Sequence, residues 1–183
     1  MKAIECTVED IVSKLINKEI GAIFQGKLEL GPRALGNRSI IADPRMKDGK
    51  DRVNLVKNRE WYRPFACRIL EEHAHEWFKM GQLRSSPWMS YAIPVKEDKW
   101  KQIPAVVHED GTCRLQTVNH KQNPFYYDLI SEFYKQTNIP LILNTSFNLA
   151  GQPIVFNHAR AIDIFLDSQL KFVYFPEIKK VVI

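Results

Sequence analysis

The order of helix-like and strand-like segments constrains the fold of this chain most strongly. Thr7 followed by Asp10 resembles a capping box, and Pro124 after Asn123 is typical of a second helix start. Short apolar runs between turn residues are typical of buried strands. Helices are expected within 8–16, 47–57, 124–133 and 158–166, and strands within 22–25, 39–42, 86–95, 103–108, 112–118, 140–143, 172–175 and 181–183. Because the two kinds do not alternate regularly, we predict an α+β or mixed α/β domain with a substantially mixed sheet.

Two local patterns predict how neighbouring segments pack. Asp110 and Gly111 suit a tight type I′ turn, so 103–108 and 112–118 are expected to pair as a β-hairpin. Asn157 is expected to cap the last helix. The side chains expected on the buried face of that helix are Ala159, Ile162, Phe165 and Leu166.

Composition excludes several classes of protein. No run of about 18 apolar residues is present, so we expect no transmembrane helix. The N-terminus lacks the basic-then-apolar pattern of a secretory signal. Three cysteines without a Cys-x-x-Cys pair favour reduced thiols in the cytoplasm over a disulfide framework or a zinc site. We expect Cys67 and Cys113 to be small core residues, and we expect no set of metal ligands.

Positive charge is concentrated in one part of the chain. Residues 27–63 hold ten Lys or Arg and five Asp or Glu, which accounts for the whole net charge of +5. The remaining residues hold 16 of each sign and are neutral together. This segment is either a solvated basic face or a local site for phosphate or another anion.

Segment 31–39 combines a flexible backbone with two arginines. Its two glycines permit backbone conformations that a side chain would forbid, and Pro32 stiffens its entry. Arg33 and Arg38 carry forked donors suited to phosphate or carboxylate oxygens. A structural turn with exposed arginines explains the same residues.

Three cations, Lys57, Arg59 and Arg63, lie among aromatic residues. They fit a nucleic-acid patch in which bases stack on Trp61 or Tyr62. They also fit ordinary packing with cation–π contacts. A third interpretation is a phosphate clamp, in which the lysine supplies a point charge and an arginine supplies geometry.

Residues 144–148 follow an apolar strand, so their small polar side chains are expected at a strand end, where open α/β sheets bind ligands. Ser146 is interpreted as a hydrogen-bond donor to an oxyanion, and a turn held by side chain-to-backbone bonds is the alternative. His108, with Asp110 and Arg114 nearby in the sequence, is a further site candidate.

Together these segments resemble the C-terminal domain of carbamoyltransferases of the NodU and CmcH type. The resemblance covers nearly the whole chain, and its blocks 31–39 and 144–148 are highly specific. Cys67 and Cys113 depart from the family pattern, but neither removes a charge or a donor. The matching positions are 25–26, 31–39, 42–45, 53–54, 57, 59–61, 63–66, 103–106, 108, 110–112, 114, 116, 144–148 and 151–154.

The resemblance implies a YrdC-like fold, a twisted mixed sheet with flanking helices, and a carbamoyl-adenylate site. In that chemistry carbamoyl phosphate is hydrolysed to carbamate, which attacks the α-phosphorus of ATP to give carbamoyl-AMP and pyrophosphate. Mg²⁺ is expected with the nucleotide. The resemblance assigns catalysis to Lys57, Arg63, Arg114 and Ser146, and substrate or nucleotide binding to Arg33, Arg38, Arg59, His108, Asn144, Thr145 and Asn148.

The resemblance also implies an organisation. Residues 1–183 are expected to form one C-terminal domain without the actin-like ATPase-fold N-terminal domain, which passes the carbamoyl group to an acceptor hydroxyl. The expected partners are carbamoyl phosphate, ATP and that N-terminal domain or subunit, in the cytoplasm, with no membrane and no nucleic acid. The alternative is a non-catalytic RNA-binding or regulatory module of the same fold; RNA binding would weaken steeply with salt.

Overall fold

The computed structural model describes residues 1–29, 31 and 33–183. In these residues nine strands form one sheet, in the order β1-β9-β8-β2-β3-β7-β4-β6-β5. Pro32, which is expected to stiffen the entry of segment 31–39, lies outside the described residues. The strands are β1 (Ala3–Glu5), β2 (Gly21–Phe24), β3 (Arg38–Ala42), β4 (Ala66–Leu70), β5 (Ala92–Pro94), β6 (Thr112–Val118), β7 (Leu141–Ser146), β8 (Phe172–Phe175) and β9 (Lys180–Val182).

The sheet mixes parallel and antiparallel pairs, which confirms the predicted mixed α/β class. β2 runs parallel to β8, and β4 runs parallel to β6. β7 is antiparallel to both of its neighbours, β3 and β4. The two parallel pairs are therefore separated by antiparallel strands in the middle of the sheet, where the candidate site lies.

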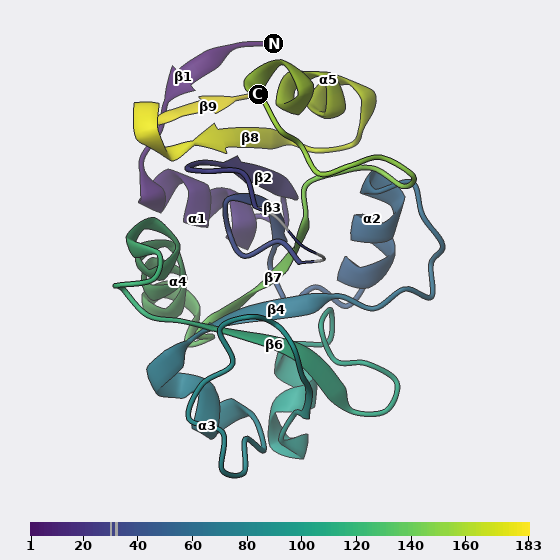
Figure 1. Ribbon diagram of the computed structural model, residues 1–183, viewed down its shortest axis with the longest axis vertical. Helices are drawn as coiled ribbons and strands as arrows, with labels where there is room; N and C mark the ends of the chain where they lie inside the picture. The colour runs from purple at the N-terminus through teal and green to yellow at the C-terminus, as the bar shows by residue number, and fades with distance from the viewer. Residues whose placement is uncertain (30, 32) are drawn as a thin grey trace.

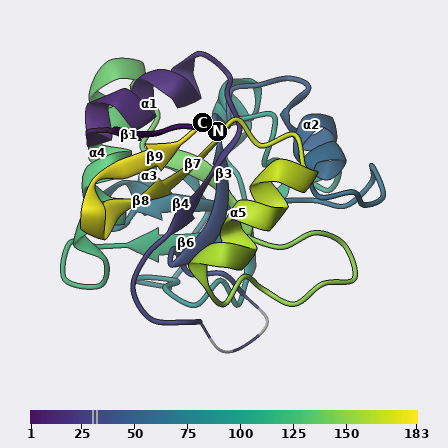
Figure 2. The ribbon, with the colours of Figure 1, turned by 90° about the horizontal axis from the view of Figure 1, so that it is seen from above.

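Helices cover both sides of the central strands. α1 and α4 lie together on one side, and α2 lies on the other, in both Figure 1 and Figure 2. α5 packs against β8 near the two termini (Figure 1). The helices are α1 (Val8–Ile16), α2 (Gly49–Val56), α3 (Ala74–Trp77), α4 (Pro124–Thr137) and α5 (His158–Asp167), with 3-10 turns at Glu71–His73, Glu97–Gln102 and Pro176–Ile178.

The predicted helix starts are confirmed by their capping bonds. The Thr7 hydroxyl accepts from the Asp10 backbone N–H at 3.3 Å, and the Asp10 carboxylate accepts from the Thr7 N–H at 2.8 Å. The Asn123 side chain accepts from the Tyr126 N–H at 3.0 Å. Asn157 caps α5 in the same way. Each bond satisfies a backbone donor that has no partner within the helix.

The predicted buried face of α5 was wrong. Ala161 and Ile164 are buried, whereas Ala159 is exposed and Leu166 is 62% exposed. Ile162 and Phe165 lie partly buried beside the core. The helix contains apolar residues on more than one side, so its rotation is set by packing against β8 rather than by its own pattern.

The predicted hairpin was also wrong. Residues 103–108 form no strand, and the turn differs from the expected one. The Gly111 N–H donates to the His108 carbonyl at 2.9 Å, so Glu109 and Asp110 are the central residues, and neither has the positive φ of a type I′ turn. β6 pairs instead with β4 on one side and with β5 on the other. A strand has only two edges, so no edge of β6 is left for 103–108. Within 86–95, which was expected to be extended, only Ala92–Pro94 is a named strand.

A hydrophobic core fills the space between the sheet and its helices. Trp77, Phe133 and Phe147 are among its largest fully buried side chains. Cys67 and Cys113 are also fully buried, which confirms their expected role as core residues. Within the described part of the chain, no helix is both long and apolar enough to cross a membrane.

Candidate functional site

Strand register brings distant residues into one row across the middle of the sheet. Asn144, near the end of β7, lies directly opposite Ala66, the first residue of β4. Ala66 lies opposite Arg114 of β6 on its other side. Because directly opposed residues point to the same face of a sheet, the Asn144 and Arg114 side chains face the same side.

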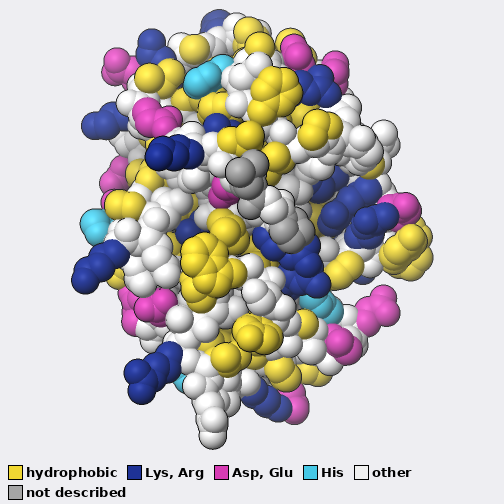
Figure 3. All heavy atoms as spheres, viewed as in Figure 1, with side chains coloured by type: hydrophobic (Ala, Val, Ile, Leu, Met, Phe, Trp, Pro, Cys, Tyr) yellow, Lys and Arg dark blue, Asp and Glu magenta, His cyan; other side chains and the backbone are white. Residues whose placement is uncertain are grey.

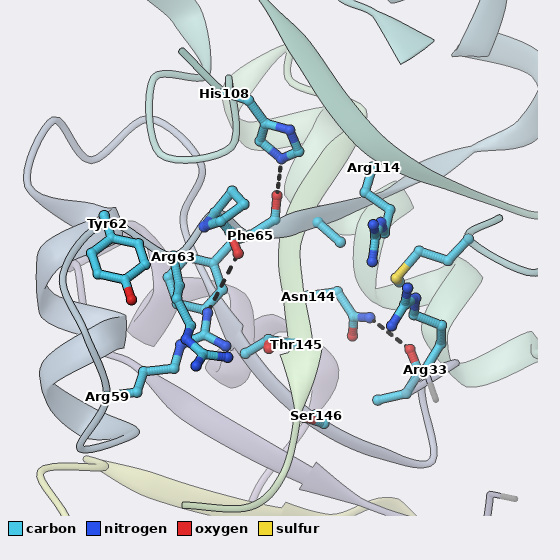
Figure 4. A pocket seen from close by; sticks show the side chains of 14 residues that line it. Arg33, Arg59, Tyr62, Arg63, Phe65, His108, Arg114, Asn144, Thr145 and Ser146 are labelled. Atoms are coloured by element: carbon cyan, nitrogen blue, oxygen red, sulfur yellow. Dashed lines mark hydrogen bonds between the residues drawn. The ribbon is translucent and has the colours of Figure 1, made fainter. Parts of the chain in front are cut away.

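A cleft of about 530 Å³ opens on this side of the sheet. In Figure 4, Arg59 and Arg63 lie on one side of β7, and Arg33 and Arg114 lie on the other. Figure 3 shows Lys and Arg side chains gathered between α2 and the middle of the sheet. The cleft is lined by Arg33, Ala34, Arg59, Tyr62, Arg63, Pro64, Phe65, Ala66, Met89, His108, Arg114, Asn144, Thr145 and Ser146.

The cleft is strongly cationic. Four arginines line it, and no acidic residue does so in the part of the chain that the structure describes. Burial, and next the charge of Arg63, lower the pKa of Arg59 to about 10. Burial, and next the charge of Arg114, also lower the pKa of Arg33. Cations from separate segments therefore approach one another here, and an anion between them would relieve their repulsion.

The arginines differ in how firmly they are held. The Arg59 guanidinium donates to the Asn54 side-chain oxygen at 2.6 Å and lies 4.3 Å from the centre of the Phe65 ring. Arg63 pairs with Glu60 at 2.7 Å, and both side chains are about half exposed, so this ion pair holds it weakly. Arg59 is therefore a fixed cation, and Arg63 is free to turn toward a ligand.

Lys57 does not line the cleft but lies behind its wall. Its ammonium donates to the carbonyl oxygens of Ser146 at 2.5 Å and of Asn148 at 2.9 Å, and to the Asn148 side-chain oxygen at 2.9 Å. The Ser146 hydroxyl donates to that same side-chain oxygen at 2.6 Å. Burial, and next the charge of Arg59, lower the pKa of Lys57 to about 7. Lys57 and Asn148 therefore hold the loop after β7.

Arg38 also lies away from the cleft. Its guanidinium donates to the carbonyl oxygens of Gln25 and Asn37 and lies 3.6 Å from the centre of the Phe24 ring. Eight of the eleven predicted site residues thus line the cleft, and Lys57, Arg38 and Asn148 do not.

Two charged residues that sequence reasoning missed shape the loop carrying Arg33. The Glu29 carboxylate accepts from the backbone N–H groups of residues 35, 37 and 38 at 2.8, 2.9 and 3.1 Å. Arg68, buried within β4, donates to the Leu35 carbonyl. A side chain at Gly36, whose φ is +107°, would overlap the Arg68 guanidinium. A charged residue inside the apolar run 65–70 was the available signal for Arg68.

His108 forms a fixed part of the cleft wall. Its Nε2 lies 2.9 Å from the Phe65 carbonyl oxygen, and because a carbonyl only accepts, this nitrogen carries a proton (Figure 4). Its Nδ1 lies 3.2 Å from the Thr112 hydroxyl. Among the described residues, no group of three His, Cys, Asp or Glu side chains is arranged to hold a metal ion.

Residues 12–180 match the model of a family described as "Carbamoyltransferase C-terminus". Nodulation protein NolO of Bradyrhizobium diazoefficiens is 51% identical over 168 residues, covering 88% of this chain and 31% of that protein. Nodulation protein U of Azorhizobium caulinodans is 39% identical over 147 residues, covering 80% of this chain and 26% of that protein. The chain therefore spans less than a third of the length of these relatives.

Two solved structures have the same fold. Full-length HypF, in a phosphate- and nucleotide-bound form, has a TM-score of 0.66 at 16% identity and covers 92% of this chain and 24% of its own. A variant of Sua5 from P. abyssi has a TM-score of 0.58 at 11% identity, and the match covers 92% of this chain and 52% of the Sua5 chain. These likenesses confirm the predicted YrdC-like fold. With the family model matching nearly the whole chain, the chain belongs to the carbamoyltransferase C-terminus family.

Proposed function

We propose that the cleft binds carbamoyl phosphate and ATP and forms carbamoyl-adenylate. The observation that carries this proposal is the convergence of four arginines on a cleft that no acidic residue lines in the described part of the chain. Both substrates are anionic and repel each other, so their approach needs fixed positive charge. HypF, which shares the fold, was solved with phosphate and nucleotide bound, and this supports the same ligand class here.

The reaction has two steps. Water cleaves carbamoyl phosphate into carbamate and inorganic phosphate. A carbamate oxygen then attacks the α-phosphorus of ATP, the bond from that phosphorus to the bridging oxygen breaks, and pyrophosphate leaves. Negative charge shifts onto the departing phosphates, and the guanidinium groups of Arg63 and Arg114 stabilise it through charge-assisted bonds of about 1.5–3 kcal/mol each.

The other site residues bind or position. Arg33 and Arg59 add charge at the walls of the cleft, and the side chains of Thr145 and Ser146 offer neutral hydrogen bonds to the carbamoyl group. Asn144 is fully buried and positions this wall, since its side chain accepts from the Tyr126 hydroxyl and donates to the Ala34 carbonyl. Lys57 fixes the end of β7 and the residues that follow it, through the carbonyls of Ser146 and Asn148. Mg²⁺ enters as part of the ATP substrate and is held by its phosphates, because the described lining of the cleft offers no carboxylate.

In this proposal, the longer relatives carry out the transfer of the carbamoyl group to a final acceptor. The chain matches under a third of their length. An actin-like-fold N-terminal domain or subunit would receive the carbamoyl group from the adenylate and pass it to an acceptor hydroxyl.

The test is exchange of labelled pyrophosphate into ATP, which reports reversible adenylate formation. We expect exchange that requires carbamoyl phosphate. Arg63→Gln and Arg114→Gln should each slow it about tenfold or more, since one charge-assisted bond corresponds to at least that factor. Arg52→Gln is the matched control, because Arg52 lies on α2 and donates to the Lys18 carbonyl outside the cleft. No exchange, or exchange independent of carbamoyl phosphate, would contradict the proposal.

A further inference from the structure

A second hollow, of about 450 Å³, adjoins the cationic cleft. The two hollows share one wall, formed by Tyr62, Pro64, Phe65 and His108. We propose that the second hollow receives the nucleoside end of the nucleotide, while its phosphates lie in the cationic cleft. This inference rests on the proposed function and specifies how ATP is oriented in it.

The charges of the two hollows differ in the way that this orientation requires. Among the described residues, the charged side chains that line the cleft are arginines, whereas Glu109, Asp110 and one lysine, Lys50, line the second hollow. Hydrogen bonds from the Thr112 side chain and backbone lower the pKa of Asp110, so this carboxylate stays ionised. Two carboxylates repel phosphates but accept hydrogen bonds from ribose hydroxyls.

The shape and polarity of the second hollow suit a flat base. Phe65, Ala105 and Val107 provide apolar lining. Tyr62 adds an aromatic side chain that is 56% exposed. An aromatic ring left exposed at the mouth of a hollow is available to stack on a base, and such stacking tolerates any base because every base has a π-face.

Two residues of the dividing wall, Phe65 and His108, are held in place. The His108 ring is held between the Phe65 carbonyl at 2.9 Å and the Thr112 hydroxyl at 3.2 Å. Phe65 is itself only 3% exposed, and the Arg59 guanidinium packs against its ring. A nucleotide that spans both hollows therefore crosses the wall near Phe65, which places its α-phosphate at the edge of the cationic cleft.

The test separates the two halves of the ligand. Binding of ATP and of inorganic tripolyphosphate is measured by calorimetry on the whole chain. We expect Tyr62→Ala to weaken ATP binding about fivefold or more, since base stacking contributes at least that factor. Val107→Trp fills the second hollow from a residue that does not line the cleft, so it should weaken ATP binding and leave tripolyphosphate binding unchanged. Tyr91→Ala is the control, because Tyr91 is 54% exposed and lines neither hollow.

The outcomes distinguish this inference from the function on which it rests. If both variants bind ATP as the wild type does, or if Val107→Trp loses as much tripolyphosphate affinity as ATP affinity, the nucleoside assignment is wrong and adenylate formation still stands. If the wild type binds neither ATP nor tripolyphosphate, both proposals fall. Circular dichroism of each variant checks that the fold is retained.

Discussion

Replacing Lys57 by Met tests whether burial behind the cleft wall lowers the pKa of the lysine and so makes the stability of the protein depend on pH. The Lys57 side chain is 3% exposed, yet its ammonium has carbonyl partners on the loop after β7. Burial disfavours the charged form, and it lowers the pKa of Lys57 from 10.5 to about 7. Methionine has a similar length and no proton to lose, so a comparison of the two proteins isolates this one titration.

The sign of the effect follows from proton binding. Below about pH 7 the lysine is protonated in both the folded and the unfolded states, and the burial penalty is fully present. Between about pH 7 and 10.5 only the unfolded state holds the proton, so the free energy of unfolding rises with pH. From about pH 6 to about pH 9, the wild type should therefore gain about 2.5 kcal/mol of stability relative to Lys57→Met.

The assay is urea unfolding of both proteins at these two pH values. Other titrating groups are common to the two proteins and cancel in the difference between them. Lys57→Arg, which keeps a charge at both pH values, is the matched control and should show no such gain. If the stability difference between the wild type and Lys57→Met is the same at both pH values, the ammonium stays charged and the reasoning from burial is refuted.

Three further substitutions test the packing around the cleft. Glu29→Gln should weaken tripolyphosphate binding in calorimetry, because an amide NH₂ replaces an oxygen that holds the loop carrying Arg33; unchanged affinity would show that the loop needs no carboxylate. Tyr126→Phe should lower the free energy of urea unfolding by about 1–3 kcal/mol, since Asn144 loses a buried donor at 2.8 Å; a smaller loss would mean that another donor replaces it. Asn123→Ala should lower the free energy of unfolding by about 1 kcal/mol, because α4 loses the side chain that caps its first turn. An unchanged melting temperature would show that the cap does not stabilise the protein.

Features that depend on neighbouring residues were predictable from the sequence. The caps at Thr7 and Asn123 involve residues three apart, so the sequence already contains both partners. Local patterns predicted a strand at 140–143 and a helix at 47–57, and the structure has β7 at Leu141–Ser146 and α2 at Gly49–Val56. The family resemblance then selected eight residues that line one cleft, because its motifs carry information about contacts that spacing alone lacks.

Features that depend on distant partners were not predictable. The order of the strands left β6 no free edge for the expected hairpin. The face that α5 buries depends on β8, and the sequence of the helix contains no information about that neighbour.

The cationic site shows the same division. The sequence by itself determined that the whole excess of positive charge lies in 27–63. It also predicted small polar residues after a strand at 140–143, whereas the structure continues that strand through Ser146, so three of these residues belong to β7 itself. The tertiary structure alone decided which cations face the cleft. Arg33 and Arg114 line it, whereas Lys57 and Arg38 donate hydrogen bonds to backbone carbonyls away from it. The reason is that a side chain's exposure depends on what packs over it, and for Lys57 those atoms come from Ser146 and Asn148, far away in the chain.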